Sequence, residues 1–398
     1  MSSFFGLTLP DGADARLRNG APVLALEGLP GAAGCEPGRQ VKLLDPHGDL
    51  VACGIADPEN GVIQILGLES VQGFDARFFA ERFKGGLGLR RALGLTGAES
   101  AYRLINAEGD GLPGFSVDCF GEYAVICAPS RPLLPYARLL AKAALAAEEP
   151  RLRGAVIKVR GKDPQDRSHK DEVIGDAPPE KYVVHELGAP YELHLLGSLN
   201  VGIFPDMREQ RRNISRFVAG RRVLNTFAYT GALSIAAARA GADTVTSVDL
   251  SSGVLAWARE NFRLSGFAPD DAHFRFEVSD VRRFMEKEVE RGNLYDTILM
   301  DPPTVSAARA SMWSMKRDYP KLISLATKLL PPAGGILWVS ANTRRGPSVL
   351  RHVEEGIRLS GRRGAVLEVG GLPPDFPTPP SWPESRYLEI CQVFVTSG

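Results

Sequence analysis

The chain has 398 residues, of which 44% are hydrophobic and 24% charged, and its 47 basic residues balance its 47 acidic ones. This composition is ordinary for a globular protein and excludes an intrinsically disordered chain. At roughly 100–200 residues per domain, the length predicts two or three domains. No apolar run approaches the ~20 residues that a membrane helix needs, and the N-terminus lacks the pattern of a secretion signal.

Cysteine and histidine usage bears on the compartment and on metal binding. The chain has five cysteines, none of them in a CxxC pair, and six scattered histidines without an HxxxH or HExxH spacing. An odd number of unpaired cysteines argues against a disulfide framework and against a structural zinc site. We therefore expect a cytoplasmic protein without a metal site.

The first 190 residues alternate between short strands, turns and two helices. Residues 40–44, 50–55 and 62–66 have strand patterns separated by Pro/Gly/Asn/Asp turns, which predicts a small β-barrel within residues 1–72. Residues 73–190 predict a central α+β domain. Its expected helices cover 74–95 and 133–147, its strands cover 102–106, 115–118, 123–127 and 154–159, and a polar loop covers 161–179.

A local excess of positive charge lies within this second region. Residues 151–170 hold seven Lys or Arg against two Asp. A basic stripe is compatible with a nucleic-acid partner even in a chain of zero net charge. A solvated polar loop is an equally good interpretation of the same residues.

From about residue 191 onward, strands and helices alternate strictly. Short apolar strands are expected at 222–227, 244–248, 274–278, 297–300 and 335–340. Helices are expected at 231–239, 252–265, 281–290 and 314–330, the last one kinked or broken at Pro320. This alternation predicts a doubly wound parallel sheet over residues 191–398.

Three acidic residues end successive strands of this sheet. Ligands of such sheets bind beyond the carboxyl ends of the strands, where Asp249, Asp280 and Asp301 fall. An acid after the second strand can hold both ribose hydroxyls, and an acid after the third can accept a hydrogen bond from an adenine amino group. The three acids together predict an adenosine site.

The turns around these acids indicate which kind of nucleoside ligand the site can hold. The first turn, residues 225–231, has a single glycine and no following Gly-Lys-Ser/Thr, whereas dinucleotide and phosphate loops need several glycines. We therefore expect a nucleoside ligand without phosphates, which S-adenosylmethionine satisfies. Two prolines after Asp301 rigidify the strand exit, so that a freed carbonyl and the Asp side chain can hold a flat base near the methyl donor.

These residues resemble the bacterial ribosomal RNA large-subunit methyltransferases of the RlmI/RlmK type. The resemblance is carried by Asn106–Gly114 with Val117-Asp118, by Val201–Arg208 with Arg211, by Val223–Gly231 and by Asp301–Thr304. It implies an α/β architecture: a doubly wound, Rossmann-like class I methyltransferase domain at 191–398, preceded by a PUA-like RNA-binding β-barrel at 1–72 and the α+β domain at 73–190. It also implies large-subunit ribosomal RNA as the partner.

The same resemblance assigns site residues by position. The implied contacts with S-adenosylmethionine are Phe204, Arg208, Asn225, Phe227, Tyr229, Thr230, Gly231, Asp249, Leu250, Asp280, Val281 and Asp301. The implied base-positioning residues are Asp301, Pro302, Pro303 and Asn342. Candidate contacts with RNA phosphates are Lys158, Arg160, Lys162, Lys316, Arg317, Arg344 and Arg345, although each is about equally well read as a solvated surface residue. A homodimer, the commonest soluble oligomer, is an open expectation.

One departure from the family concerns the chemistry. Members that methylate cytosine C5 use a cysteine thiolate, and here Ala341 occupies the position of that cysteine. Thr304 and Asn342 resemble the branch that methylates guanine N7, which carries a lone pair and needs only in-line placement against the methyl group. We therefore expect direct displacement at a base nitrogen. The alternatives are C5 methylation through Cys119, Cys127 or Cys391, a non-RNA substrate, or a binding protein without activity.

Overall fold

The computed structural model describes residues 4–98, 101–160, 170–303, 315–343 and 346–398. Residue contacts divide the chain into two compact units, neither of which is a continuous stretch. Unit 1 comprises Met1–His185, Leu193–Val201 and Pro374–Ser385; unit 2 comprises Glu186–Glu192, Gly202–Pro373 and Arg386–Gly398.

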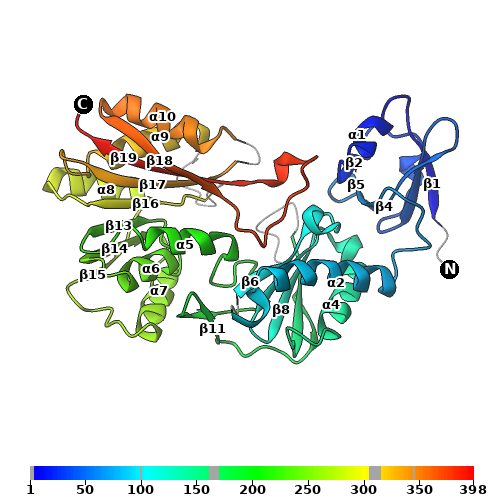
Figure 1. The fold of residues 1–398 in the computed structure, drawn as a ribbon, viewed down its shortest axis with the longest axis horizontal. Coiled ribbons are helices and arrows are strands. Elements are labelled where there is room, and N and C mark those ends of the chain that lie inside the picture. Colours follow the sequence, from blue (N-terminus) through cyan, green and yellow to red (C-terminus); the bar gives the residue numbers. More distant parts are fainter. Residues whose placement is uncertain (1–3, 99–100, 161–169, 304–314, 344–345) are drawn as a thin grey trace. The chain divides into compact units, whose positions relative to one another are not determined.

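The N-terminal part of unit 1 is a five-stranded sheet in the order β1-β3-β4-β5-β2 (Figure 1). Its core is formed by buried aliphatic side chains such as Leu7, Val41, Leu43 and Ile63. The three predicted strands are present as β3, β4 and β5, whereas β1 and β2 were not predicted because they span only four and three residues. The elements are β1 Phe5–Thr8, α1 Asp14–Arg18, β2 Val23–Ala25, β3 Gln40–Leu44, β4 Leu50–Asp57 and β5 Val62–Gly67.

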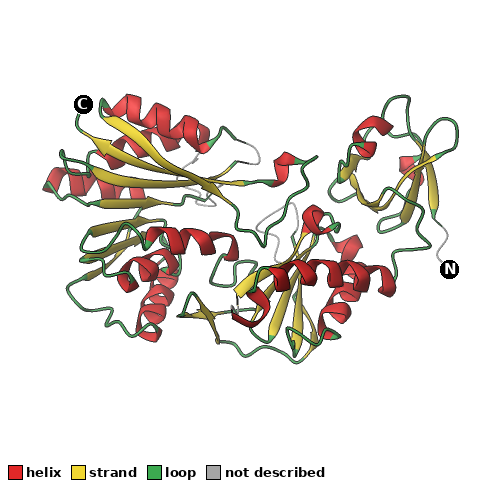
Figure 2. Cartoon of the chain, viewed as in Figure 1, coloured by secondary structure: helices red, strands yellow, loops and turns green. Residues whose placement is uncertain are grey.

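Unit 1 also contains a second five-stranded sheet, in the order β10-β9-β8-β7-β6, with two longer helices (Figure 2). The expected polar loop at 161–179 is wrong in part, because residues 172–175 form strand β10, which pairs antiparallel with β9. The elements are α2 Ala76–Ala92, α3 Leu95–Ala98, β6 Ala101–Asn106, β7 Ser116–Phe120, β8 Tyr123–Ala128, α4 Leu134–Leu145, β9 Gly154–Val159 and β10 Glu172–Gly175. Helices α2 and α4 cover a shared core with Phe79, Phe115 and Leu140 at its centre.

A clasp within unit 1 holds the segment that runs between the last two strands of unit 2. Arg90 is fully buried and forms a bidentate ion pair with Asp110, with N···O distances of 2.7 and 2.9 Å. It also donates a hydrogen bond to the carbonyl of Asp375 at 2.6 Å. A Cβ on Gly109 would lie 1.8 Å from the carbonyl oxygen of Pro377. The 106–114 motif therefore requires glycine at 109 because the returning backbone passes directly against it.

Unit 2 is built on a seven-stranded sheet in the order β15-β14-β13-β16-β17-β19-β18. The first five strands are parallel, as predicted, but β19 pairs antiparallel with both β17 and β18, so the sheet is mixed at one end. The strands are β13 Arg222–Thr226, β14 Thr244–Asp249, β15 Phe274–Val278, β16 Thr297–Met300, β17 Gly335–Asn342, β18 Arg363–Gly371 and β19 Leu388–Thr396. The hairpin of β11 Tyr182–Glu186 and β12 Ala189–Leu193 precedes them.

Helices cover both faces of this sheet. The apolar sides of α8, α9 and α10 share one core with the sheet, whereas α5, α6 and α7 pack against one another in sequence (Figure 1). The helices are α5 Arg208–Ile214, α6 Ala232–Arg239, α7 Ser252–Leu264, α8 Val281–Arg291, α9 Met315–Thr327 and α10 Val349–Ser360. Ser251 caps α7, its hydroxyl accepting from the Val254 amide. Helix α9 continues through Pro320, so of the two expected outcomes, a kink or a break, the break does not occur.

The described part of the chain contains no candidate for a membrane-spanning helix. None of these helices is both long and apolar enough to span a bilayer.

Candidate functional site

The parallel strands bring the predicted acids to one edge of the unit 2 sheet. Asp249 is the last residue of β14, Asp280 follows β15 and Asp301 follows β16, while Asn342 ends β17. Because parallel strands have their carboxyl ends on the same side, these four side chains line a common edge. We call it the carboxyl edge.

The turn after β13 is held in an unusual backbone conformation. Phe227, Tyr229 and Gly231 have φ values of 58°, 50° and 83°, a left-handed region that non-glycine residues rarely adopt. Asp249 supports this turn, since one of its carboxylate oxygens accepts from the Tyr229 amide at 3.0 Å and the other from the Ser251 amide at 3.0 Å. Such strain persists where the surroundings impose it, which is typical of binding sites.

Buried polar side chains fix the same turn from below. The Asn225 amide donates to the Ser234 hydroxyl at 2.9 Å, and both residues are fully buried. The Thr230 hydroxyl donates to the carbonyl of Gly202, and the Asn261 amide donates to the carbonyl of Thr230 at 3.0 Å. The side chains of Asn225 and Thr230, which were predicted as ligand contacts, thus form hydrogen bonds that shape the turn.

Exposed apolar side chains surround the first two acids. The rings of Phe204 and Tyr229 lie 5.2 Å apart, and the Trp257 ring follows at 6.3 Å from Tyr229. Phe204 is 40% exposed, Leu250 59% and Val278 56%. Val278 is the register partner of Asp249 across β14 and β15. Apolar surface beside a carboxylate suits a flat heterocycle joined to a sugar diol.

Helix α5 carries three arginines, and the two that are buried, Arg208 and Arg211, differ in their contacts. Arg211 forms a buried ion pair with Glu186 at 2.5 and 2.7 Å and donates to the carbonyl of Phe204 at 2.9 Å. Arg211 therefore anchors the segment that carries Phe204. Arg208 is also buried, with its Nε 3.7 Å from the Glu209 carboxylate.

The carboxyl edge beside β16, where Asp301 lies, differs electrostatically from the part that carries Asp249 and Asp280. Asp301 accepts a hydrogen bond from the Ser340 hydroxyl. Burial raises the pKa of Asp301 to about 6; the bond from Ser340 opposes that rise, and the charge of Asp206 adds to it. Asp206 itself accepts from the Tyr387 hydroxyl at 2.7 Å. Asp206 and Tyr387 were not predicted as a pair, because 181 positions separate them and no local pattern joins them.

The remaining predicted residues lie on or near the edge. Asp280 caps α8, accepting from the Arg283 amide at 3.1 Å, and Val281 behind it is buried. Pro302 is buried, whereas Pro303 is exposed, and Asn342 is half-buried. The carboxyl edge thus gathers the cofactor and base-positioning candidates in one place.

The predicted RNA contacts divide into three groups. The prediction that Lys158 contacts RNA is wrong. Lys158 is 1% exposed and forms an ion pair with Asp171 at 2.6 Å, so its charge is neutralised inside unit 1. Arg160, Lys316 and Arg317 are exposed, and Arg317 also pairs with Asp318. Lys162, Arg344 and Arg345, like Thr304, lie outside the described residues.

The cysteines considered as nucleophiles lie in hydrophobic cores. Cys391 is on β19, opposite Val339 of β17, and burial raises the pKa of its thiol to about 11. Burial likewise raises the pKa of Cys119 to about 12, and Cys127 is buried on β8 of unit 1. Ala341 is buried as well. Over the described ranges, no cluster of three or more His, Cys, Asp or Glu side chains is arranged to hold a metal ion.

Comparison with known proteins places this edge in a family. The family model of S-adenosylmethionine-dependent methyltransferases matches residues 138–381. Ribosomal RNA large subunit methyltransferase I of Photobacterium profundum is 27% identical over 393 residues, covering 97% of this chain and 98% of that protein. The protein of the same name from Aeromonas salmonicida is 31% identical over 323 residues, covering 79% and 80%.

Solved structures share the fold over the whole length. The crystal structure of SMU.776, complexed with SAH, has a TM-score of 0.87 at 24% identity and covers 98% of this chain and 100% of that chain. A structure from Streptococcus mutans has a TM-score of 0.85 at 24% identity, with the same coverage. Because the family model spans more than half of the residues and the Aeromonas relative exceeds 30% identity, this chain belongs to the S-adenosylmethionine-dependent methyltransferase family.

Proposed function

We propose that this enzyme methylates large-subunit ribosomal RNA. The relatives from Photobacterium and Aeromonas carry that activity in their names, and the first of them matches 97% of this chain. The match extends through unit 1 as well as unit 2.

We infer that three domains serve this activity. They are a PUA-like RNA-binding domain at 1–72, a central α+β domain at 73–190 and the catalytic domain at 191–398, of which Leu193–Val201 and Pro374–Ser385 pack with unit 1. The five-stranded sheet β1–β5, with its own core, supports the first assignment.

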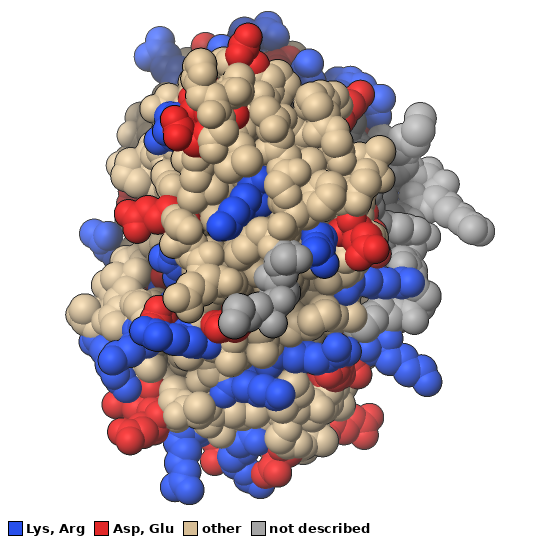
Figure 3. Space-filling model, turned by 90° about the vertical axis from the view of Figure 1, so that its right-hand side faces the viewer, with Lys and Arg blue, Asp and Glu red and all other residues tan. Residues whose placement is uncertain are grey.

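Lys and Arg side chains project across the lower half of the face in Figure 3, among fewer Asp and Glu. Such a distribution supports contact with a phosphate backbone despite the zero net charge.

The carboxyl edge fits the family's cofactor by the chemistry of its side chains. Asp249 would accept from the ribose hydroxyls, since each of its oxygens keeps a lone pair beyond the backbone amide that it already binds. Exposed Leu250 and Val278 would cover the faces of the adenine, with Asp280 toward its amino group. When bound, S-adenosylmethionine supplies an electrophilic methyl group on a positively charged sulfur.

The reaction that we propose is direct displacement at a base nitrogen, of the guanine N7 kind. The observation that carries this proposal is the lack of a reactive thiol at the described part of the carboxyl edge: Ala341 stands where a nucleophile would be, and Cys391 is in the core. A ring nitrogen with a lone pair needs neither a covalent partner nor a base, only placement in line with the methyl group. Asp301, Pro302, Pro303 and Asn342 would supply that placement.

Methyl transfer from labelled S-adenosylmethionine tests both parts of the proposal. Deproteinised large-subunit RNA and large-subunit particles would be offered in parallel, and the labelled nucleoside identified by mass spectrometry after digestion. We expect label in 7-methylguanosine. Label in 5-methylcytidine would overturn the displacement mechanism, and no label in either substrate would overturn ribosomal RNA as the substrate.

A further inference from the structure

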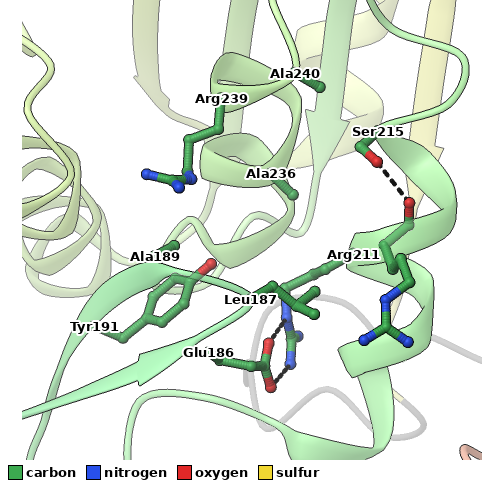
Figure 4. Close-up of a pocket in the computed structure, with 10 residues that line it drawn as sticks. Glu186, Leu187, Ala189, Tyr191, Arg211, Ser215, Ala236, Arg239 and Ala240 are labelled. Carbon is green, nitrogen blue, oxygen red and sulfur yellow. Dashed lines mark hydrogen bonds and ion pairs between the residues drawn. The ribbon is translucent and has the colours of Figure 1, made fainter. Parts of the chain in front are cut away.

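A pocket in unit 2 lies apart from the carboxyl edge. It encloses about 210 Å³ and is bounded by the β11–β12 hairpin, helix α5 with the residue after it, and the second half of helix α6 (Figure 4). Helix α6 begins at the turn on the carboxyl edge, so its last residue, Arg239, lies toward the opposite edge of the sheet. The pocket is therefore separate from the methyl-transfer site. Its lining residues are Glu186, Leu187, Ala189, Tyr191, Arg211, Arg212, Ser215, Ala236, Arg239 and Ala240.

The charge of the lining is mainly positive. It contains three arginines and one glutamate, and Arg211 neutralises that glutamate in the buried ion pair described above. Arg212 is exposed and pairs with Glu209 outside the pocket. Arg239 is exposed and has no ion pair with any described residue. An anion entering this pocket would therefore meet the unused guanidinium of Arg239.

A second, independent feature points into the same space. Tyr191 is only 2% exposed, yet its hydroxyl points toward the interior bounded by Leu187, Ala236 and Arg239 (Figure 4). Burial raises the pKa of this hydroxyl and the charges of Arg211, Glu186 and Arg239 act on it, but no hydrogen bond from a described residue is among these influences. Buried phenol groups normally have a partner, so this hydroxyl is available to donate to a ligand in the pocket.

The small residues of the lining leave room for that acceptor. Ala189, Ala236 and Ala240 form part of the wall, and longer side chains there would fill the space. Arg239 also passes close to the hairpin turn, since a Cβ on Gly188 would lie 3.5 Å from its Nη2. The attraction between a basic side chain and the negative C-terminal end of helix α6 accounts for an arginine at position 239. It accounts neither for the pocket nor for the orientation of Tyr191.

We propose that this pocket binds a phosphate group of the RNA substrate, with Arg239 and the Tyr191 hydroxyl as donors. This inference rests on RNA being the substrate. Guanidinium groups recognise phosphate oxygens through paired N–H donors, and a hydroxyl supplies a further hydrogen bond. The pocket thereby fixes a part of the RNA that lies away from the methylated base, and it acts on affinity and leaves the chemical step unchanged.

RNA affinity across a salt series tests the proposal. Binding of a labelled ribosomal RNA fragment would be measured by fluorescence anisotropy for the wild type, Arg239→Gln and Tyr191→Phe. Arg282→Gln serves as the control, since it removes one exposed charge from α8 and does not line the pocket. We expect Arg239→Gln to weaken binding about fivefold at about 0.1 M salt and to lower the salt slope by about one. Tyr191→Phe should weaken binding about twofold without changing the slope.

Methyl transfer then separates this inference from the proposed function. At saturating RNA, kcat of Arg239→Gln should equal that of the wild type, while KM for RNA rises. Wild-type affinity and slope in Arg239→Gln, with RNA still bound and methylated, would overturn the pocket assignment alone. If the wild-type enzyme neither binds nor methylates RNA, both proposals fall. If inorganic phosphate binds the wild type but not Arg239→Gln, while RNA binding is unaffected, the ligand is a free phosphate and the RNA assignment is overturned.

Discussion

The two halves of the carboxyl edge hold their acids by different means. Asp249 and Asp280, after β14 and β15, accept from backbone amides and are flanked by exposed apolar side chains. Asp301, after β16, accepts from a side-chain hydroxyl and has a pKa raised to about 6 by burial. The same pattern of a strand followed by an acid thus yields two environments: one suited to hold a polar nucleoside, the other able to change its charge near neutral pH.

The largest expected effect comes from removing the acid of the first half. Asp249→Ala should weaken S-adenosylmethionine binding about 100-fold, because it removes a charged acceptor for two hydroxyls and releases the Tyr229 amide. Isothermal titration calorimetry measures the affinity, and circular dichroism checks that the variant is folded. Binding within threefold of the wild type would show that the first half does not hold the ribose.

Replacing Asp301, the acid after β16, should raise the free energy of unfolding at high pH. Because the pKa of Asp301 is about 6 in the fold and ordinarily 3.8, its protonated form stabilises the protein below pH 4, and this contribution is lost as the pH rises to 6. Asp301→Asn should therefore be about 2–3 kcal/mol more stable than the wild type at pH 8 and about equal at pH 4. Urea unfolding at both values measures the difference.

The opposite pH trend would contradict the buried environment of Asp301. Ser340→Ala offers a matched control, since it removes the hydroxyl that donates to Asp301 while leaving the carboxyl group in place. This variant should raise the Asp301 pKa further and steepen the loss of stability between pH 4 and 7.

A smaller effect separates ligand binding from helix capping at Asp280. Asp280→Ser keeps an N-cap acceptor for α8, and Asp280→Ala removes it. We expect both to weaken cofactor binding about threefold to tenfold, whereas only the alanine variant loses about 1 kcal/mol of stability. Equal cofactor affinity in the wild type and both variants would restrict Asp280 to capping.

The smallest effect is expected at the cysteine of β19. Cys391→Ala should leave kcat of methyl transfer within about twofold of the wild type, because the thiol is buried between β17 and β18 and has a pKa raised to about 11. A loss of more than about 100-fold, with cofactor binding intact, would identify a covalent step.

Sequence reasoning reached the parallel part of the sheet because each strand there is a short, largely apolar run, and three of the five are followed by or end in an acid. It placed β13 to β17 and the acids within one or two residues. It missed β18 and β19, which lie after the last βα repeat, and it missed the Asp206–Tyr387 hydrogen bond, which the return of β19 creates. Lys158 illustrates the complementary error, since charge in a sequence does not reveal that the side chain is buried against Asp171.

The clasp around Arg90 has a consequence for biosynthesis. Unit 1 includes Pro374–Ser385, so its contacts with Asp375 and Pro377 form only after nearly the whole chain has left the ribosome. An N-terminal fragment emerging first would keep Arg90 paired with Asp110 but would lack the backbone that passes over Gly109. Unit 1 thus reaches its final form together with unit 2, and a single cut in the chain cannot yield both units intact.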